Sequence, residues 1–125
     1  MKTTNSIINV LKPKSEKDIK NSIKNTPIDK VREYLSYAIR NNNENIIKLI
    51  LENKRMNMNH LDPSKWTYLM NAIIYNCSED IILLLINLGS NVNFKNIYGS
   101  TPLSVANANK KMKIVKLLKK HGAKL

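Results

Sequence analysis

The chain has 125 residues, of which 42% are hydrophobic, so it can form one compact domain and is unlike a disordered chain. Cys77 is its only cysteine, which excludes an intramolecular disulfide and indicates a reducing compartment. No stretch approaches the roughly 20 apolar residues of a membrane helix, and the apolar residues before Lys12-Pro13 are too scattered for a secretory signal. We therefore expect a cytoplasmic protein, with delivery into a host cell left open.

The formal net charge of +12 at pH 7 is concentrated at the two ends of the chain. Residues 1–30 contain seven lysines and three acids, and residues 110–125 contain seven lysines and no acid. Arginine is rare, whereas lysine, asparagine and isoleucine are abundant, which is typical of a low-GC genome. We attribute much of the net charge primarily to this compositional bias of the genome, and only secondarily to function.

Residues 1–25 are interpreted as a lysine-rich N-terminal segment outside the main domain. Ser15 and Asp18 have the spacing of a capping box, and Ile19 and Ile23 could share one face of a short helix. A disordered arm is the alternative with equal support.

Residues 26–125 are expected to form the main domain, as three similar segments at about 26–58, 59–92 and 93–125. The first segment predicts an elongated helix, with Thr26 as its N-cap and Pro27 at its first position. The apolar stripes of its two helices are Ile28, Val31, Leu35 and Ala38, and then Ile46, Ile47, Leu49 and Ile50. Lys54-Arg55 stands where the later segments have a glycine. An atypical first segment is expected of an N-terminal cap.

The second segment predicts a short helix that is capped by Thr67, with Leu69 and Ala72 directed inward. Ser78 is the expected cap of a second helix, which ends at Gly89. The apolar stripe of that helix is Ile81, Ile82, Leu84 and Leu85.

The third segment is the clearest, because Tyr98–Ala106 reads YGSTPLSVA. Gly99 suits a tight turn, Thr101 an N-cap and Pro102 the first helical position. A second helix follows with the stripe Ile114, Val115, Leu117 and Leu118, and Gly122 ends it. Its first helix lies 34 residues after that of the second segment and its second helix 33 residues after, so an extra residue is expected around Asn76–Glu79.

This order of turn, Thr-Pro-Leu, short helix, apolar second helix and terminating glycine resembles the ankyrin repeat family over roughly residues 27–125. The resemblance implies an all-α solenoid of about three helix–turn–helix repeats with finger-like turns. Family repeats usually carry a histidine after Thr-Pro-Leu that joins neighbouring loops, and here Ser104 and Met70 stand at that position. Lys65 and Tyr68 replace the finger glycine and the proline of the second repeat.

The sequence offers no constellation of catalytic or metal-binding residues. His60 and His121 are the only histidines, and neither has a cysteine, serine or aspartate at motif spacing. The three glycines are all assigned to turns, so no phosphate-binding loop is present. We therefore expect no enzymatic activity, no metal and no cofactor.

The resemblance implies a concave binding face that is formed by the finger tips and the exposed side of each first helix. The variable contact positions of the family carry over to Leu61, Ser64, Trp66, Ile74, Tyr75, Lys95, Ile97, Tyr98, Ser100 and Asn109. Tryptophan and tyrosine frequently anchor protein interfaces. The predicted function is a monomeric, non-catalytic protein–protein interaction module of the adaptor, scaffold or effector type, with a protein partner of unknown identity.

Two alternatives stay open. Trp66 and Tyr98 could serve local packing rather than partner contact. The lysine-rich termini could bind nucleic acid or another acidic surface, although the end of a repeat array needs a polar outer face in any case. Arginine, which commonly reads base edges, is scarce in this chain.

Overall fold

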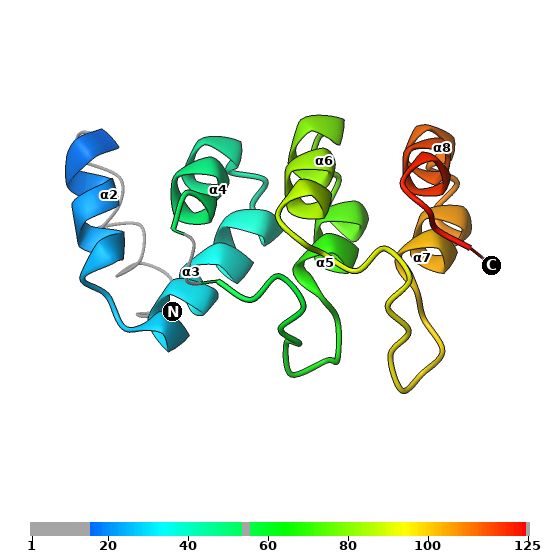
Figure 1. The fold of residues 1–125 in the computed structure, drawn as a ribbon, viewed down its shortest axis with the longest axis horizontal. Coiled ribbons are helices and arrows are strands. Elements are labelled where there is room, and N and C mark those ends of the chain that lie inside the picture. Colours follow the sequence, from blue (N-terminus) through cyan, green and yellow to red (C-terminus); the bar gives the residue numbers. More distant parts are fainter. Residues whose placement is uncertain (1–15, 54–55, 125) are drawn as a thin grey trace. The chain divides into compact units, whose positions relative to one another are not determined.

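The computed structural model describes residues 16–53 and 56–124, and these residues form seven α-helices and no strand. The chain divides into two compact units, Met1–Met56 and Asn57–Leu125, which we call the N-terminal and C-terminal units (Figure 1). The predicted glycine-equivalent pair Lys54-Arg55 and the predicted cap Ser15 lie outside the described residues.

The N-terminal unit contains the helices α2 (Glu16–Lys24), α3 (Ile28–Arg40) and α4 (Glu44–Leu51). Helix α4 packs against both α2 and α3. Ile19 and Ile23 of α2 are buried, and the Lys20 ammonium pairs with the Glu52 carboxylate at 2.9 Å, just after α4. Helix α3 is almost twice as long as the first helices of the later repeats, as the continuous apolar stripe predicts.

The predicted cap of α3 is wrong. The N-cap of this helix is Pro27, and no side chain makes a capping hydrogen bond there. The Thr26 hydroxyl instead donates to the carbonyl of Ser22 in the last turn of α2. Since α2 ends at Lys24, Ser22 belongs to its last turn, where carbonyls can accept hydrogen bonds from groups beyond the helix.

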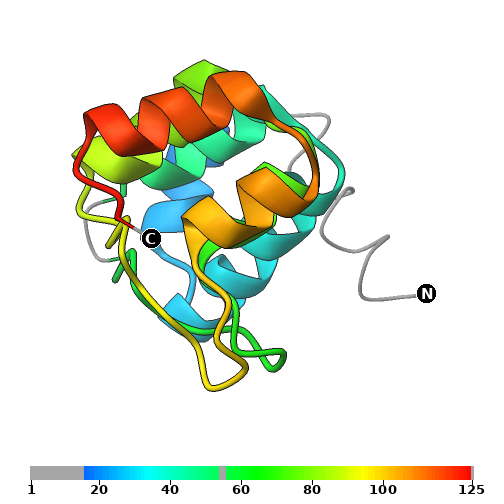
Figure 2. The same ribbon diagram turned by 90° about the vertical axis from the view of Figure 1, so that its right-hand side faces the viewer.

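The C-terminal unit contains α5 (Tyr68–Ile74), α6 (Glu79–Asn87), α7 (Pro102–Ala108) and α8 (Met112–Lys120). Helix α5 packs against α6 and α7, and α7 packs against α8. Two loops, residues 61–66 and 95–100, project from the same side of this unit below the first helices, and we call them the second and third fingers (Figures 1 and 2). In each predicted second-helix stripe of this unit, three positions are buried and the third position, Leu84 or Leu117, is half-buried.

Three helices of the C-terminal unit, α5, α6 and α7, have the N-caps that the sequence predicts. The side-chain oxygens of Thr67, Ser78 and Thr101 accept hydrogen bonds from the backbone N–H three residues later, at 3.2, 3.4 and 3.0 Å. Ser104 completes a capping box, because its hydroxyl accepts from the backbone N–H of Thr101 at 2.8 Å. Local sequence therefore determines where these helices begin.

One turn recurs after the first helix of every repeat. A residue with positive φ is followed by a backbone N–H that donates to an alanine carbonyl five residues earlier, as in a Schellman motif. The positive-φ residues are Asn42, Asn76 and Lys110, and the accepting residues are Ala38, Ala72 and Ala106. In the first and third repeats, the residue directly after the positive-φ residue is the N-cap of the next helix. In the second repeat, Cys77 lies between the positive-φ residue and the N-cap Ser78. This is the extra residue that the spacing predicts.

Lys65 occupies the position of the finger glycine without changing the turn. Its φ is 68°, compared with 82° for Gly99, and the N–H of each donates to the carbonyl three residues earlier, at 2.9 and 3.0 Å. A side chain in this left-handed region costs about 1–2 kcal/mol, which glycine avoids. The second finger therefore keeps its shape at the expense of backbone strain.

We expect Lys65→Gly to raise the free energy of unfolding by about 0.5–1 kcal/mol, because relief of this strain exceeds the entropy that glycine adds to the unfolded chain. Urea denaturation followed by circular dichroism measures the change. Lys95→Gly is the control, because Lys95 itself has no positive φ, so this substitution should destabilise the protein. Equal destabilisation by both substitutions would contradict the claim that the backbone is strained at Lys65.

Candidate binding site on the fingers and first helices

Each finger is built around one acidic or amide side chain. One carboxylate oxygen of Asp62 accepts from the N–H groups of Ser64 and Trp66, both at 2.9 Å. Asn96 Oδ1 accepts from the N–H groups of Tyr98 and Ser100 at the same distances. The N–H of Asp62 also donates to the Trp66 carbonyl at 2.9 Å, and Asn96 makes the matching bond to Ser100 at 3.0 Å. These three hydrogen bonds close each finger, in addition to the bond from Lys65 or Gly99 to the carbonyl three residues earlier.

The fourth residue of each first helix in this unit modifies this pattern. The second carboxylate oxygen of Asp62 accepts from Asn71 Nδ2 at 2.9 Å, so the second finger is joined to α5. The equivalent position in α7 is the buried Val105, which offers no partner, and Asn96 Nδ2 is buried without one among the described residues. The third finger is therefore held to its helix less tightly than the second.

Two asparagines join successive loops, a role that the sequence analysis missed. Asn59 Nδ2 donates to the Gly89 carbonyl at 3.1 Å, and its Oδ1 accepts from the Asn91 N–H at 2.7 Å. Asn93 makes the same pair of bonds, to the Gly122 carbonyl at 3.0 Å and from the Lys124 N–H at 2.8 Å. These bonds join successive loops in a chain that has Met70 and Ser104 where the resemblance implies a histidine. The sequence shows that the two asparagines occupy equivalent positions of successive repeats, but it does not show which groups they bind.

The ten predicted contact residues all lie in the C-terminal unit, and none of them is buried. The finger members are Leu61, Ser64, Trp66, Lys95, Ile97, Tyr98 and Ser100. The helix-end members are Ile74, the last residue of α5, with Tyr75 and Asn109, the residues that directly follow α5 and α7. A helix of seven residues is about 10 Å long, so these two groups lie at opposite ends of the first helices. We call the finger members together the finger face.

Ile97 and Tyr98 are the most exposed large apolar side chains among the described residues, at 76% and 71%. Tyr75 is 41% exposed, and Trp66 is half-buried at the base of its finger. The tip of the third finger therefore presents two large side chains to solvent on a backbone that Asn96 holds in place.

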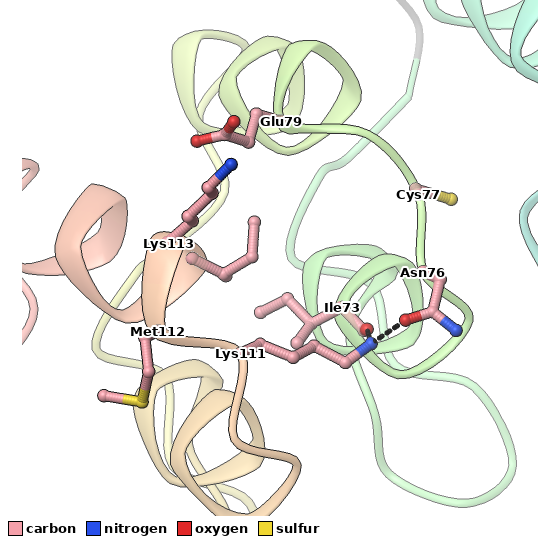
Figure 3. A pocket seen from close by; sticks show the side chains of 8 residues that line it. Ile73, Asn76, Cys77, Glu79, Lys111, Met112 and Lys113 are labelled. Atoms are coloured by element: carbon pink, nitrogen blue, oxygen red, sulfur yellow. Dashed lines mark hydrogen bonds between the residues drawn. The ribbon is translucent and has the colours of Figure 1, made fainter.

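A pocket of about 300 Å³ lies at the helix-end side, between the two repeats of the C-terminal unit (Figure 3). The Lys111 ammonium crosses it and donates to the Ile73 carbonyl and to Asn76 Oδ1. A cation at the C-terminus of α5 neutralises carbonyls that lack helical partners. Lys113 and Glu79 point toward one another over the same pocket. In the sequence, Lys111 is only one of the seven lysines of residues 110–125, and nothing there singles it out.

The histidines occupy structural positions. The ring of His60 stacks on the ring of Tyr68, with centroids 6.4 Å apart, and His121 is the C-cap of α8. In the described parts of the chain, no three side chains of histidine, cysteine, aspartate or glutamate gather in a way that could hold a metal ion. None of the described helices has the length and apolar character needed to cross a membrane.

Comparison with known protein families matches the chain to ankyrin repeats (3 copies), over residues 2–96 and 35–125. Among solved structures, an ankyrin repeat domain from Acinetobacter baumannii AYE is similar, with a TM-score of 0.64 and 30% sequence identity. That match covers 73% of this chain and 48% of the other, so this chain spans about half the length of the Acinetobacter structure. A comparison with curated proteins found no match. The predicted all-α fold of helix pairs with finger-like turns is confirmed.

Proposed function

Because the chain belongs to the ankyrin repeat family, whose repeats are generally protein–protein interaction modules, we propose that it binds a partner protein through the finger face. In this proposal it is a non-catalytic adaptor, scaffold or effector that needs no metal or cofactor and acts as a cytoplasmic monomer. The helix-end members Ile74, Tyr75 and Asn109 extend the contact along the first helices.

The exposure of Ile97 and Tyr98 is the observation that carries the proposal. Two large side chains that stay exposed to water contribute no burial energy to the folded state. Their burial by a partner would remove apolar area from solvent and so favour binding. Tyrosine is frequent among the residues that dominate interface energies. The exposed fraction of Tyr98 also supports contact over the packing alternative for this residue.

The hydrogen bonds of the fingers add a second argument. Binding requires that mobile side chains and loops become ordered, at about 0.5–1.5 kcal/mol for each flexible side chain. Asn96 already fixes the backbone on both sides of the tip, through Tyr98 and Ser100. A preorganised finger therefore loses little entropy on binding. Lys95 and Ser64 are exposed polar members of the finger face, and interfaces commonly have such residues at their rim.

Photo-cross-linking tests this proposal directly. A photoreactive phenylalanine analogue at position 98 should form a covalent product with one protein in a lysate of the source cells, after nuclease treatment and at about 0.5 M salt, where surface charge is screened. The matched control carries the analogue at Met112, which is 55% exposed on α8 and outside the finger face. A cross-linked product from the analogue at position 112, with none from the analogue at position 98, would contradict the proposal.

A further inference from the structure

The last 45 residues of the chain have charges of one sign only. Residues 81–125 contain eight lysines and neither aspartate nor glutamate. Helix α8 turns Ile114, Val115 and Leu118 toward the core, and Lys113, Lys116, Lys119 and Lys120 are exposed on its other side. A helix at the end of a repeat array needs a polar outer face, but polarity alone does not require every charge to be positive.

Two exposed lysines of the N-terminal unit have acidic partners, and two lysines near the start of α8 are directed at groups around the pocket. In the N-terminal unit the Lys20 ammonium pairs with Glu52 at 2.9 Å, and that of Lys30 pairs with Glu33 at 3.5 Å. At the start of α8, Lys111 is bound to Ile73 and Asn76, and Lys113 points toward Glu79. Lys116, Lys119 and Lys120 make no ion pair with any carboxylate in residues 16–53 and 56–124. We call these three residues the lysine face.

We propose that the lysine face binds the phosphate backbone of duplex nucleic acid, without sequence preference. A duplex carries one negative charge about every 1.7 Å along its axis, so lysines that are neighbours on one helix face can meet phosphates in any register. Lysine acts as a point charge on a flexible stem, which suits contacts to phosphate in any orientation. The surface is separate from the finger face and does not depend on the function proposed for it.

The chemistry of α8 favours nucleic acid over the other acidic partners. An amphipathic helix binds a lipid surface by burying its apolar side, but the apolar side of α8 already lies in the core. Protein interfaces are depleted in lysine and anchored by aromatic residues. Helix α8 is rich in lysine and has no aromatic residue. Interfaces with nucleic acid are, in contrast, strongly positive and polar.

The test is fluorescence anisotropy with the full chain and a mixed-sequence DNA duplex of about 20 base pairs, at several salt concentrations between about 0.05 and 0.2 M. The variant is Lys116→Gln/Lys119→Gln/Lys120→Gln. The control is Lys17→Gln/Lys24→Gln/Lys48→Gln, which removes the same charge from exposed lysines of the N-terminal unit. A third variant replaces the lysine face by arginine. Circular dichroism verifies that each variant is folded.

We expect the slope of log Kd against log salt to fall by about 2–3 units in the lysine-face variant, at about 0.9 per phosphate contact, and the affinity at the lowest salt to fall at least ~10-fold. The control triple should keep most of the slope, and the arginine variant should retain the affinity. Equal losses in both glutamine triples would overturn the proposal, because net charge alone would then explain binding. Absence of duplex binding by the wild type, or tighter lysine-dependent binding to phosphatidylserine vesicles, would also overturn it.

Discussion

Replacement of both Ile97 and Tyr98 by alanine should lower the affinity for the cross-linked partner at least ~100-fold. Each side chain is more than two-thirds exposed, so truncation leaves the folded chain intact and removes only what the partner would bury. Loss of one central interface anchor costs about 2 kcal/mol or more, and two neighbouring anchors together account for the expected change. Isothermal titration calorimetry with the purified partner measures the affinity.

The control for this experiment is Leu88→Ala/Met112→Ala. These side chains are also large, apolar and exposed, at 40% and 55%, but they lie outside the finger face at the end of α6 and the start of α8. Their truncation should leave the affinity within about twofold, a difference of about 0.4 kcal/mol. A similar loss in both double variants would mean that apolar exposure in general, rather than the finger tip, determines binding.

Leu69→Ala should lower the free energy of unfolding by about 3–5 kcal/mol. Leu69 is completely buried in α5, the helix that packs against both α6 and α7. Its truncation leaves a cavity in the layer that holds the two repeats of the C-terminal unit together. Because the total stability of a small domain is about 5–15 kcal/mol, this single change removes a large part of it.

Urea denaturation followed by circular dichroism measures this effect, with Leu88→Ala as the matched control. The exposed Leu88 loses the same atoms without leaving an internal cavity, so its truncation should cost well under about 1 kcal/mol. Equal destabilisation by both leucine substitutions would contradict the assignment of Leu69 to the core.

The parts of the fold that sequence predicted are those fixed by local interactions. Thr67, Ser78 and Thr101 cap helices because their partners lie three residues away. The extra residue of the second repeat follows from a difference in spacing, which needs no knowledge of contacts in space. The finger turn at Lys65 also follows the repeat, because the surrounding hydrogen bonds are kept even where the residue is strained.

The parts that sequence did not predict depend on partners far apart in the chain. Asn59 bonds to loop residues 30 and 32 positions later, and Lys111 reaches the end of α5 across 38 residues. Polar side chains at such separations have many candidate partners, and only the packing of the helices selects one. The cap assigned to Thr26 was wrong for a related reason, since the neighbouring end of α2 offered its hydroxyl a different partner.

The position of the candidate residues outside the core was predictable from the sequence, whereas their membership of a binding site stays a prediction. All ten predicted residues lie on surface positions of the C-terminal unit, because the repeat pattern defines which positions face outward. Which of them project furthest depends on the finger geometry, and this singles out Ile97 and Tyr98 rather than Trp66. Their contribution to binding stays a prediction.

Hydrogen exchange of the chain with and without its cross-linked partner tests the central claim most directly. The claim places the contact on the fingers, so the backbone amides of residues 61–66 and 95–100 should exchange more slowly in the complex. The amides of α8 should be unchanged by the protein partner. Slower exchange confined to α8, with unchanged fingers, would contradict the finger face as the binding surface.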